Sequence, residues 1–297
     1  MKIAAFDIGG TALKMGVMAR DGRLLETARQ SINDSDGDRI LQAMLSWLAA
    51  HPSCEGIAIS APGYIDPYSG LITMGGAIRR FDNFAMKSWL ETRTGLPVSV
   101  ENDANCVLLA ERWQGKAAEM ANFLVLTIGT GIGGAIFCQH QLINGARFRA
   151  GEFGYMLTDR PGGRDPRRYS MNENCTLRVL RHRYAQHIGA PLDSVTGELI
   201  FDRYDAGDPV CQRLVAEFFN GLGHGLYNLV HIFDPQTIFI GGGVVERPGF
   251  LTLLRQHLAW FGIADYLDTV SHGNDAGLIG AVYHFNQLYR SPDDDRH

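Results

Sequence analysis

A dense run of glycines at residues 126–134 constrains the fold of this chain more than any other feature. The run reads LTIGTGIGG and lies between two apolar segments, residues 122–125 and 135–138. Two strands that meet at a glycine-rich turn are therefore expected. Glycine has no Cβ and adopts positive φ readily, so successive backbone N–H groups can face a phosphate at close range. The pattern indicates an anion cradle.

A similar pattern stands near the N-terminus. An apolar segment, residues 3–6, leads into the turn DIGGT at residues 7–11 and then into a second apolar segment beyond Lys14. A single Gly-rich hairpin is common and structural, and unrelated hairpins are the alternative interpretation. Two such patterns at the heads of similar-sized halves favour a duplicated α/β domain with a nucleotide between the halves.

Composition narrows the class of protein. The chain has 297 residues, of which 45% are hydrophobic, and this is enough for two domains with large cores. The net charge of -5 comes without a basic stripe, so nucleic acid is not expected as a partner. The five cysteines form no Cys-x-x-Cys pair, which argues against a disulfide framework. The first strand is expected from residue 2 and no apolar stretch has membrane-spanning length, so we expect a cytoplasmic protein without a membrane partner.

The first domain is predicted to cover residues 1–116 and to alternate strands with helices. Residues 33–38 form a polar loop, and residues 64–83 show no clear period and are expected to be a long loop, a length that is usually functional or disordered. The expected strands are residues 2–18 (a hairpin), 24–30, 56–60 and 98–100, and the expected helices are residues 40–48, 84–94 and 107–113.

The second domain is predicted to cover residues 117–275 and to open with the central hairpin. The Pro, Gly and Arg run at 160–170 indicates an exposed loop, and a helix should begin near Cys175. A long helix is expected at 208–233, where apolar residues recur every four positions as a core stripe. A strand at 237–240 then ends in a third glycine turn. Beyond the second domain, an amphipathic helix is expected at 276–289 and a disordered acidic tail at 291–297.

Asp103 is the strongest candidate for a catalytic group. It follows a strand and opens a helix, and a helix N-terminus favours the ionised carboxylate. An ionised Asp beside a substrate hydroxyl is the base that phosphoryl transfer needs. Asn102 and Asn105 add hydrogen-bonding groups beside it. The alternative is that Asp103 is only the N-cap of the helix.

Asp7 is expected to hold Mg²⁺, through water. It lies between a buried strand and two glycines, so its carboxylate would repel a bound phosphate unless a cation intervened. The alternative is a turn Asp that binds its own backbone. Further phosphate contacts are expected from four residues, of which the lone Lys is the weakest because such a side chain is usually solvated: Thr11, Lys14, Thr130 and Gly131. Glu152, between two glycines, is either a ligand of sugar hydroxyls or an ordinary surface residue.

The ordered motifs of the chain resemble those of the ROK family, which comprises sugar kinases and related repressors. The resemblance runs from residue 3 to about residue 283 and rests on five motifs: DIGGT at 7–11, ENDAN at 101–105, TIGTGIGG at 127–134, GEFG at 151–154 and IGGG at 240–243. A ROK repressor would carry a DNA-binding helix-turn-helix before the first strand. Since that strand is expected from residue 2, we favour the kinase.

The resemblance implies an actin-like, ribonuclease H-like ATPase fold, with two α/β domains, a cleft between them and a helix at 276–290 that completes the first domain. It implies ATP and Mg²⁺ as cofactors, Asp103 as base, Asn102 and Glu152 as sugar ligands, and a homodimer. The ATP site would be built from the glycine turns, with these contacts: Asp7, Gly9, Gly10, Thr11, Lys14, Thr130, Gly131, Gly133, Gly242 and Gly243.

Two departures from the family pattern bear on metal and substrate. Family members have a cysteine-rich zinc segment where residues 167–177 keep only Cys175, so no zinc is expected. Tyr155 stands where the family has His, and Leu177 stands in place of a Glu, so two polar contacts near the anomeric carbon are lost. Such an open or apolar wall would admit a second ring.

The expected substrate is therefore a β-glucoside such as cellobiose, phosphorylated on the 6-hydroxyl of its non-reducing glucosyl unit. The pattern around Gly75 and Gly76 resembles the β-glucoside kinase branch of the family and adds Gly76 as a substrate contact. Glucokinase and N-acylmannosamine kinase are the alternatives within the family. A non-catalytic sugar sensor is the alternative of another class.

Overall fold

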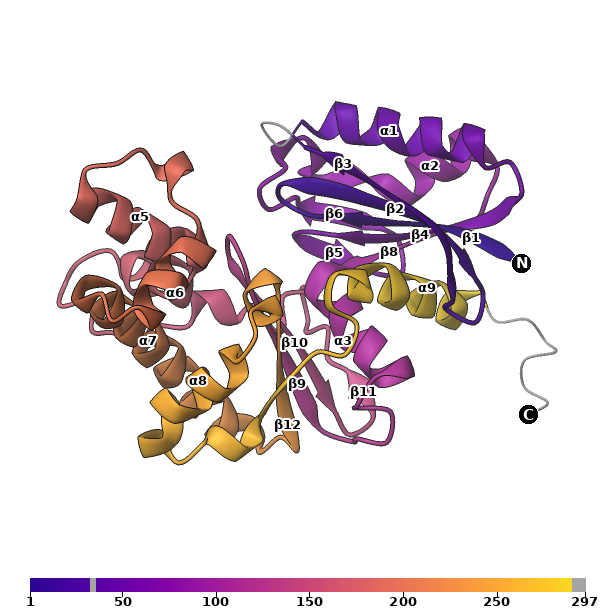
Figure 1. Cartoon of the computed structure of the whole chain (residues 1–297). Coiled ribbons are helices and arrows are strands. Elements are labelled where there is room, and N and C mark those ends of the chain that lie inside the picture. The colour runs from indigo at the N-terminus through magenta and orange to yellow at the C-terminus, as the bar shows by residue number, and fades with distance from the viewer. Residues whose placement is uncertain (33–35, 290–297) are drawn as a thin grey trace. The chain divides into compact units, whose positions relative to one another are not determined.

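A computed structural model describes residues 1–32 and 36–289, and these divide into two compact units. Unit 1 comprises Met1–Glu119, Asn144–Ala150 and the segment from Asn274 onward, and unit 2 comprises Met120–Ile143 and Gly151–Gly273 (Figure 1). The domain boundaries expected at 116 and 275 stay predictions. The expected tail at 291–297 and part of the polar loop at 33–38 lie outside the described residues.

Unit 1 is built on a five-stranded sheet in the order β3-β2-β1-β4-β8. β1 pairs antiparallel with β2 and parallel with β4, so the first strand lies at the centre of the sheet. The bounds are β1 Lys2–Ile8, β2 Ala12–Ala19, β3 Leu24–Ser31, β4 Cys54–Ala61 and β8 Val98–Asn102.

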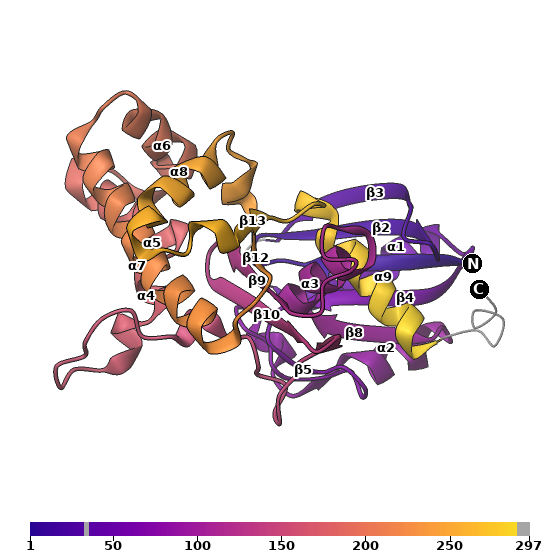
Figure 2. The same cartoon turned by 90° about the horizontal axis from the view of Figure 1, so that it is seen from below.

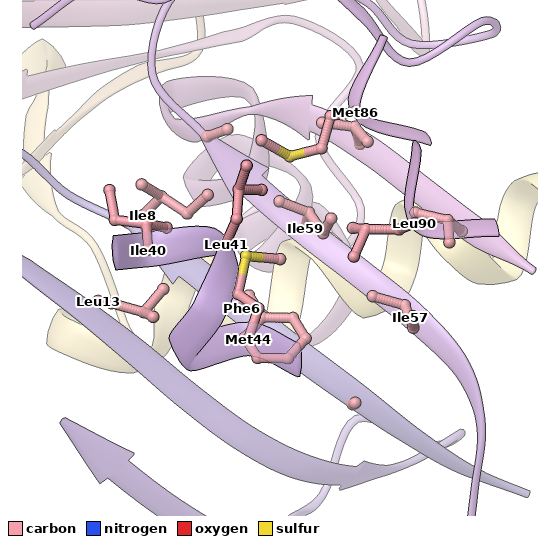
Figure 3. Packing of buried hydrophobic residues seen from close by; sticks show 14 of the residues in the cluster. Phe6, Ile8, Leu13, Ile40, Leu41, Met44, Ile57, Ile59, Met86 and Leu90 are labelled. Atoms are coloured by element: carbon pink, nitrogen blue, oxygen red, sulfur yellow. The ribbon is translucent and has the colours of Figure 1, made fainter. Parts of the chain in front are cut away.

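Helices cover both faces of this sheet, which explains why its central strands β1 and β4 are largely buried and apolar, whereas the edge strand β3 is mostly exposed. Alternate residues of β1 point to opposite sides: Phe6 and Ile8 pack with Met44 of α1 (Gly37–Ala50) in one cluster. Figure 3 shows this packing from close by. Ile3 and Ala5 face the opposite cluster, which includes residues of α3 (Asp103–Gln114) and α9 (Ala276–Leu288).

The helix expected at 276–289 is confirmed as α9, but it is buried on nearly every side, so the expected amphipathic character is wrong. It lies across the sheet from α1 and beside α3 (Figures 1 and 2). Gly280 permits the close approach, because a Cβ there would overlap the backbone of Cys106 in α3. The sheet covers one side of α9 and α3 another, which leaves little room for a polar face.

The segment at 64–83, expected to be a loop, instead carries short strands. β5 (Tyr64–Asp66), β6 (Leu71–Met74) and β7 (Phe84–Ala85) form a small antiparallel sheet. α2 therefore begins at Met86 and runs as Met86–Thr94, two residues later than expected. Strands of two to four residues give no readable period.

Unit 2 repeats the arrangement of unit 1 in a second five-stranded sheet, β11-β10-β9-β12-β13. Its first strand, β9, again pairs antiparallel with its hairpin partner β10 and parallel with β12. This shared topology favours the duplicated domain over unrelated hairpins. The bounds are β9 Phe123–Ile128, β10 Ile132–Cys138, β11 Gln141–Leu142, β12 Thr237–Gly241 and β13 Leu267–Thr269.

The longest helix of unit 2, α7, confirms the predicted core stripe. Leu214, Phe218, Leu222 and Leu226 are all buried. Near Cys175 the chain forms two helices rather than one, and α6 and α8 have no counterpart in the sequence-based expectation. The helices of the unit are α4 Met171–Asn174, α5 Leu177–Ile188, α6 Gly197–Asp205, α7 Pro209–Phe233 and α8 Phe250–Leu258. Across residues 1–32 and 36–289, no helix combines the length and apolar character that crossing a bilayer requires.

Candidate active site

The first glycine turn of unit 1 joins β1 to β2 and is closed by a bond from the Gly9 N–H to the Ala12 carbonyl, 2.9 Å. Gly10 and Thr11 lie at its exposed tip. Asp7 precedes the turn and is opposite Lys14 on β2 and Ser60 on β4 in the strand register. The sequence-predicted residues Asp7, Gly9, Gly10, Thr11 and Lys14 are thus brought together.

The Asp7 carboxylate has partners on both oxygens. Ser60 Oγ donates to Oδ1 at 2.7 Å, and Lys14 Nζ lies 3.3 Å from Oδ2. The carboxylate also packs against Gly277 in the first turn of α9, where a Cβ would come within 2.5 Å of Oδ1. A helix N-terminus stabilises an anion at this place.

Lys14 is not the solvated side chain that its sequence context suggests. Besides Asp7, its Nζ donates to the backbone carbonyl of Asn274 at 2.5 Å, and the side chain is only 22% exposed. Part of the charge on Asp7 is therefore neutralised by Lys14. A single carboxylate still suits Mg²⁺, which binds proteins through one or two carboxylates and takes its other ligands from water and nucleotide phosphates.

The start of α3 fixes Asn102 and Asp103. Asn102 is the N-cap, because its Oδ1 accepts from the N–H groups of Ala104 and Asn105 at 2.9 and 3.1 Å. Its Nδ2 donates to the Gly63 carbonyl at 3.0 Å. Asp103 is the first residue of the helix, half-buried, so the alternative that Asp103 is the cap is wrong. Its carboxylate lies where the positive end of the helix dipole favours ionisation.

Glu101, in β8, contacts the residues at the start of α3 and was not singled out from the sequence. Its side chain is 1% exposed, and Oε1 accepts from the Asn102 N–H at 2.7 Å and from Asn105 Nδ2 at 3.0 Å. Glu101 ends a buried strand only four residues before Asn105 in the first turn of α3, and this short separation of two polar residues was a signal that could have found the contact. Glu101 thus fixes the residues on both sides of Asp103.

Gly76 lies near Gly63, which Asn102 contacts. It adopts a φ of 62°, and a Cβ there would stand 3.4 Å from Pro62 and 3.7 Å from the Gly63 nitrogen. Since Gly63 also accepts the bond from Asn102, Gly76 and Asn102 are linked through one short loop.

The second glycine turn, between β9 and β10, is closed by a bond from the Gly129 N–H to the Gly131 carbonyl, 2.9 Å. Thr130 and Gly131 are exposed at its tip, and Gly133 lies within β10. The third turn lies against the second: Gly242 has a φ of 92°, and a Cβ there would overlap the Ile128 carbonyl. The structure thereby brings together the four predicted ATP contacts at 130, 131, 242 and 243 with Gly133.

The loop at 151–155 packs directly on β10. Gly151, with a φ of 85°, and the buried Phe153 ring both press on Gly134, where a Cβ would overlap them. Glu152 is half-buried, and Tyr155 ends a short 3-10 helix with 52% of its surface exposed. Asn172 of α4, which sequence reasoning missed, contacts this loop at Gly154.

Cys175 lies in the buried interior of unit 2. Its Sγ packs on Gly221 of α7, and burial raises the pKa of the thiol to about 11. Within the described part of the chain, no three His, Cys, Asp or Glu side chains gather in a way that would hold a metal. The expectation of no zinc stays a prediction.

Comparison with known proteins places the chain in a family. The sequence pattern of the ROK family matches residues 3–287. The β-glucoside kinase of Listeria innocua is 59% identical over 97% of this chain and 98% of its own length.

Solved structures of similar proteins support the same family assignment. The Lmo2764 protein of Listeria monocytogenes, described as a candidate N-acetylmannosamine kinase, is 57% identical with a TM-score of 0.94, over 97% of this chain and 99% of its own. A ROK glucokinase from Streptomyces griseus in complex with glucose and AMPPNP is 25% identical with a TM-score of 0.80, over 98% and 99%. The chain therefore belongs to the ROK family and has its actin-like ATPase fold.

Proposed function

We propose that this ROK-family sugar kinase transfers the γ-phosphoryl group of ATP to the 6-hydroxyl of the non-reducing glucosyl unit of β-glucosides such as cellobiose. The observation that carries the substrate is the 59% identity, over nearly the whole chain, to a protein named β-glucoside kinase. The exposed Tyr155, 52% open to solvent, is consistent with room for a second ring.

Asp103 acts as the base in this proposal. Its carboxylate takes the proton of the sugar 6-hydroxyl while the oxygen forms a bond to the γ-phosphorus, and the bond from that phosphorus to the β-phosphate oxygen breaks to release ADP. The hydrogen bonds from Asn102 to Glu101 and to Gly63 fix the start of α3 and thereby hold the base in place. Positioning supplies much of the acceleration in such reactions.

The glycine turns and Asp7 bind the nucleotide. The exposed peptide groups of Thr130 and Gly131 offer N–H groups to phosphate, and Asp7 would hold Mg²⁺ through its water shell. The metal, when bound, neutralises charge on the transferring phosphoryl group. Glu152 and Asn102 are proposed sugar contacts, with Gly76 and Tyr155 beside the acceptor.

Asp103→Asn tests the base. We expect its turnover of ATP with cellobiose, followed as ADP release, to fall by about 10²–10⁴-fold, the range that general base catalysis supplies. Binding of cellobiose, measured by calorimetry, should change little. Asp38→Asn is the matched control, since Asp38 also lies in the first turn of a helix of unit 1. Full activity of Asp103→Asn would refute the base, and no ADP release by the wild type with any sugar would favour the sensor.

The acceptor is tested by comparing cellobiose, glucose and N-acetylmannosamine at one ATP concentration. A strong preference for glucose would favour glucokinase, and a preference for N-acetylmannosamine would favour the activity suggested for the Listeria monocytogenes protein.

We also infer a cytoplasmic homodimer from the family resemblance. Sedimentation velocity would contradict the dimer if the chain stayed monomeric at micromolar concentration.

A further inference from the structure

The short helix α4 is anchored on α7 by two small residues. Met171, at the start of α4, packs on Gly225, and Cys175, just beyond its end, packs on Gly221. A Cβ at either glycine would come within 2.5 Å of the sulfur atom, so α4 sits as close to α7 as the backbone allows. The bond from the Met171 N–H to the Met156 carbonyl, 2.9 Å, adds a further tie. Both ends of α4 are therefore held closely against α7.

Asn172 of α4 contacts the second glycine turn. Its Oδ1 accepts the N–H of Ile132 at 2.8 Å, and a Cβ at Gly131 would stand 3.4 Å from the same oxygen. The other end of the turn is fixed by the bond from the Gly129 N–H to the Gly131 carbonyl. The peptide groups of Thr130 and Gly131 thus lie between two fixed points.

The same side chain lies against the loop at 151–155. A Cβ at Gly154 would come 2.6 Å from Cγ and Oδ1 of Asn172, so the amide plane rests on the Gly154 backbone. One side chain from α4 therefore touches both the glycine turn and the loop that carries Glu152 and Tyr155. Its helix neighbour Asn174 makes no such link: Nδ2 of Asn174 donates to the carbonyls of Arg168 and Ser170.

We propose that Asn172 is a positioning residue for phosphoryl transfer, which holds the nucleotide turn at 129–132 and the acceptor loop at 151–155 at a fixed spacing. The inference rests on the proposed function, because it takes the turn as the phosphate cradle and the loop as the acceptor side. Removing the side chain leaves the Ile132 N–H without its protein acceptor and frees the turn. Nucleotide affinity should then fall although Asn172 need not touch the nucleotide.

The test compares Asn172→Ala with Asn174→Ala in the full chain, because both lose an amide of α4 that bonds backbone groups. We expect Asn172→Ala to bind AMPPNP about tenfold more weakly, as the loss of a hydrogen bond to a backbone group suggests, and to raise KM for the glycoside. Asn174→Ala should lower the melting temperature without changing AMPPNP affinity. Equal AMPPNP affinities in the two variants would overturn the proposal.

A second variant gives an independent readout. Gly154→Ala presses on Asn172 from the acceptor side and should weaken AMPPNP binding, whereas in the Asn172→Ala background it should have little effect because the space is open. Strictly additive effects would count against the link, and Gly154→Ala alone carries the test should Asn172→Ala fail to fold. The expected differences in AMPPNP affinity between these variants do not depend on which sugar is the acceptor. They would therefore appear even if the proposed substrate were wrong, so failure of the proposed substrate is distinguishable from failure of this inference.

Discussion

The close approach of the third glycine turn to the second gives the sharpest stability prediction. Gly242 has φ 92° and ψ 166°, a backbone region that is essentially restricted to glycine. A Cβ there would overlap the Ile128 carbonyl oxygen and lie 2.9 Å from its carbon and 3.0 Å from the Ile128 nitrogen. These are backbone atoms of β9, so no side-chain rotation relieves the overlap.

Gly242→Ala should therefore be costly. The disfavoured backbone contributes about 1–3 kcal/mol, and overpacking against β9 contributes about 1–3 kcal/mol more. The combined loss should lower the melting temperature by about 3–10 °C for a chain of this size. Since Ile128 leads directly into the turn at 129–131, we also expect KM for ATP to rise.

The neighbouring glycine provides the control. Gly243 lies in the same turn, but its φ is outside the positive range and a Cβ there would meet nothing within 4 Å. Gly243→Ala should thus melt close to the wild type by differential scanning calorimetry. Equal melting temperatures for Gly242→Ala and Gly243→Ala would refute the argument that backbone contact between the two turns holds them together.

Three further predictions rest on burial and capping. Burial raises the pKa of Cys175 to about 11, so iodoacetamide at neutral pH should label the half-buried Cys138 long before Cys175, as peptide mass spectrometry would show; equal rates would contradict this. Burial lowers the pKa of His257, so the folded state resists protonation and stability should fall as pH drops below about 6.5. His257→Gln should flatten this acid limb in urea denaturation, and an unchanged limb would exclude His257 as its cause. Asn102→Ala should cost about 1–2 kcal/mol through loss of the α3 cap, whereas Asn102→Asp keeps the acceptor and should cost less in the same assay.

The glycine turns and their flanking strands could be predicted because glycine and apolar periodicity are local signals. The same holds for the buried stripe of α7. The small sheet at β5 to β7 could not, because its strands are too short to show alternation. The burial of α9 depends on α3 and on the sheet, which lie far away in the sequence, and its own residues do not reveal that both sides are covered.

The candidate site shows the same limit. Asp103 and Asn102 were identified, but which of them caps α3 is a shift of one residue, finer than a helix start can be placed from sequence. Lys14 was the weakest of the four expected phosphate contacts, and its bond to Asn274, far along the chain, could not be predicted from the residues around it. Asn172 belongs to no motif, since its contacts arise from the way α4 packs on the glycines of α7.

The place of α9 sets an order of events during synthesis. Residues 1–119 leave the ribosome first, yet the sheet face bearing Ile3, Ala5 and Ala58 is covered in part by α9, which emerges last among the described helices. Unit 2, whose sheet is complete by residue 269, can mature before unit 1 does. Until α9 has been synthesised, the apolar residues of this face that pack against α9 lack that covering helix.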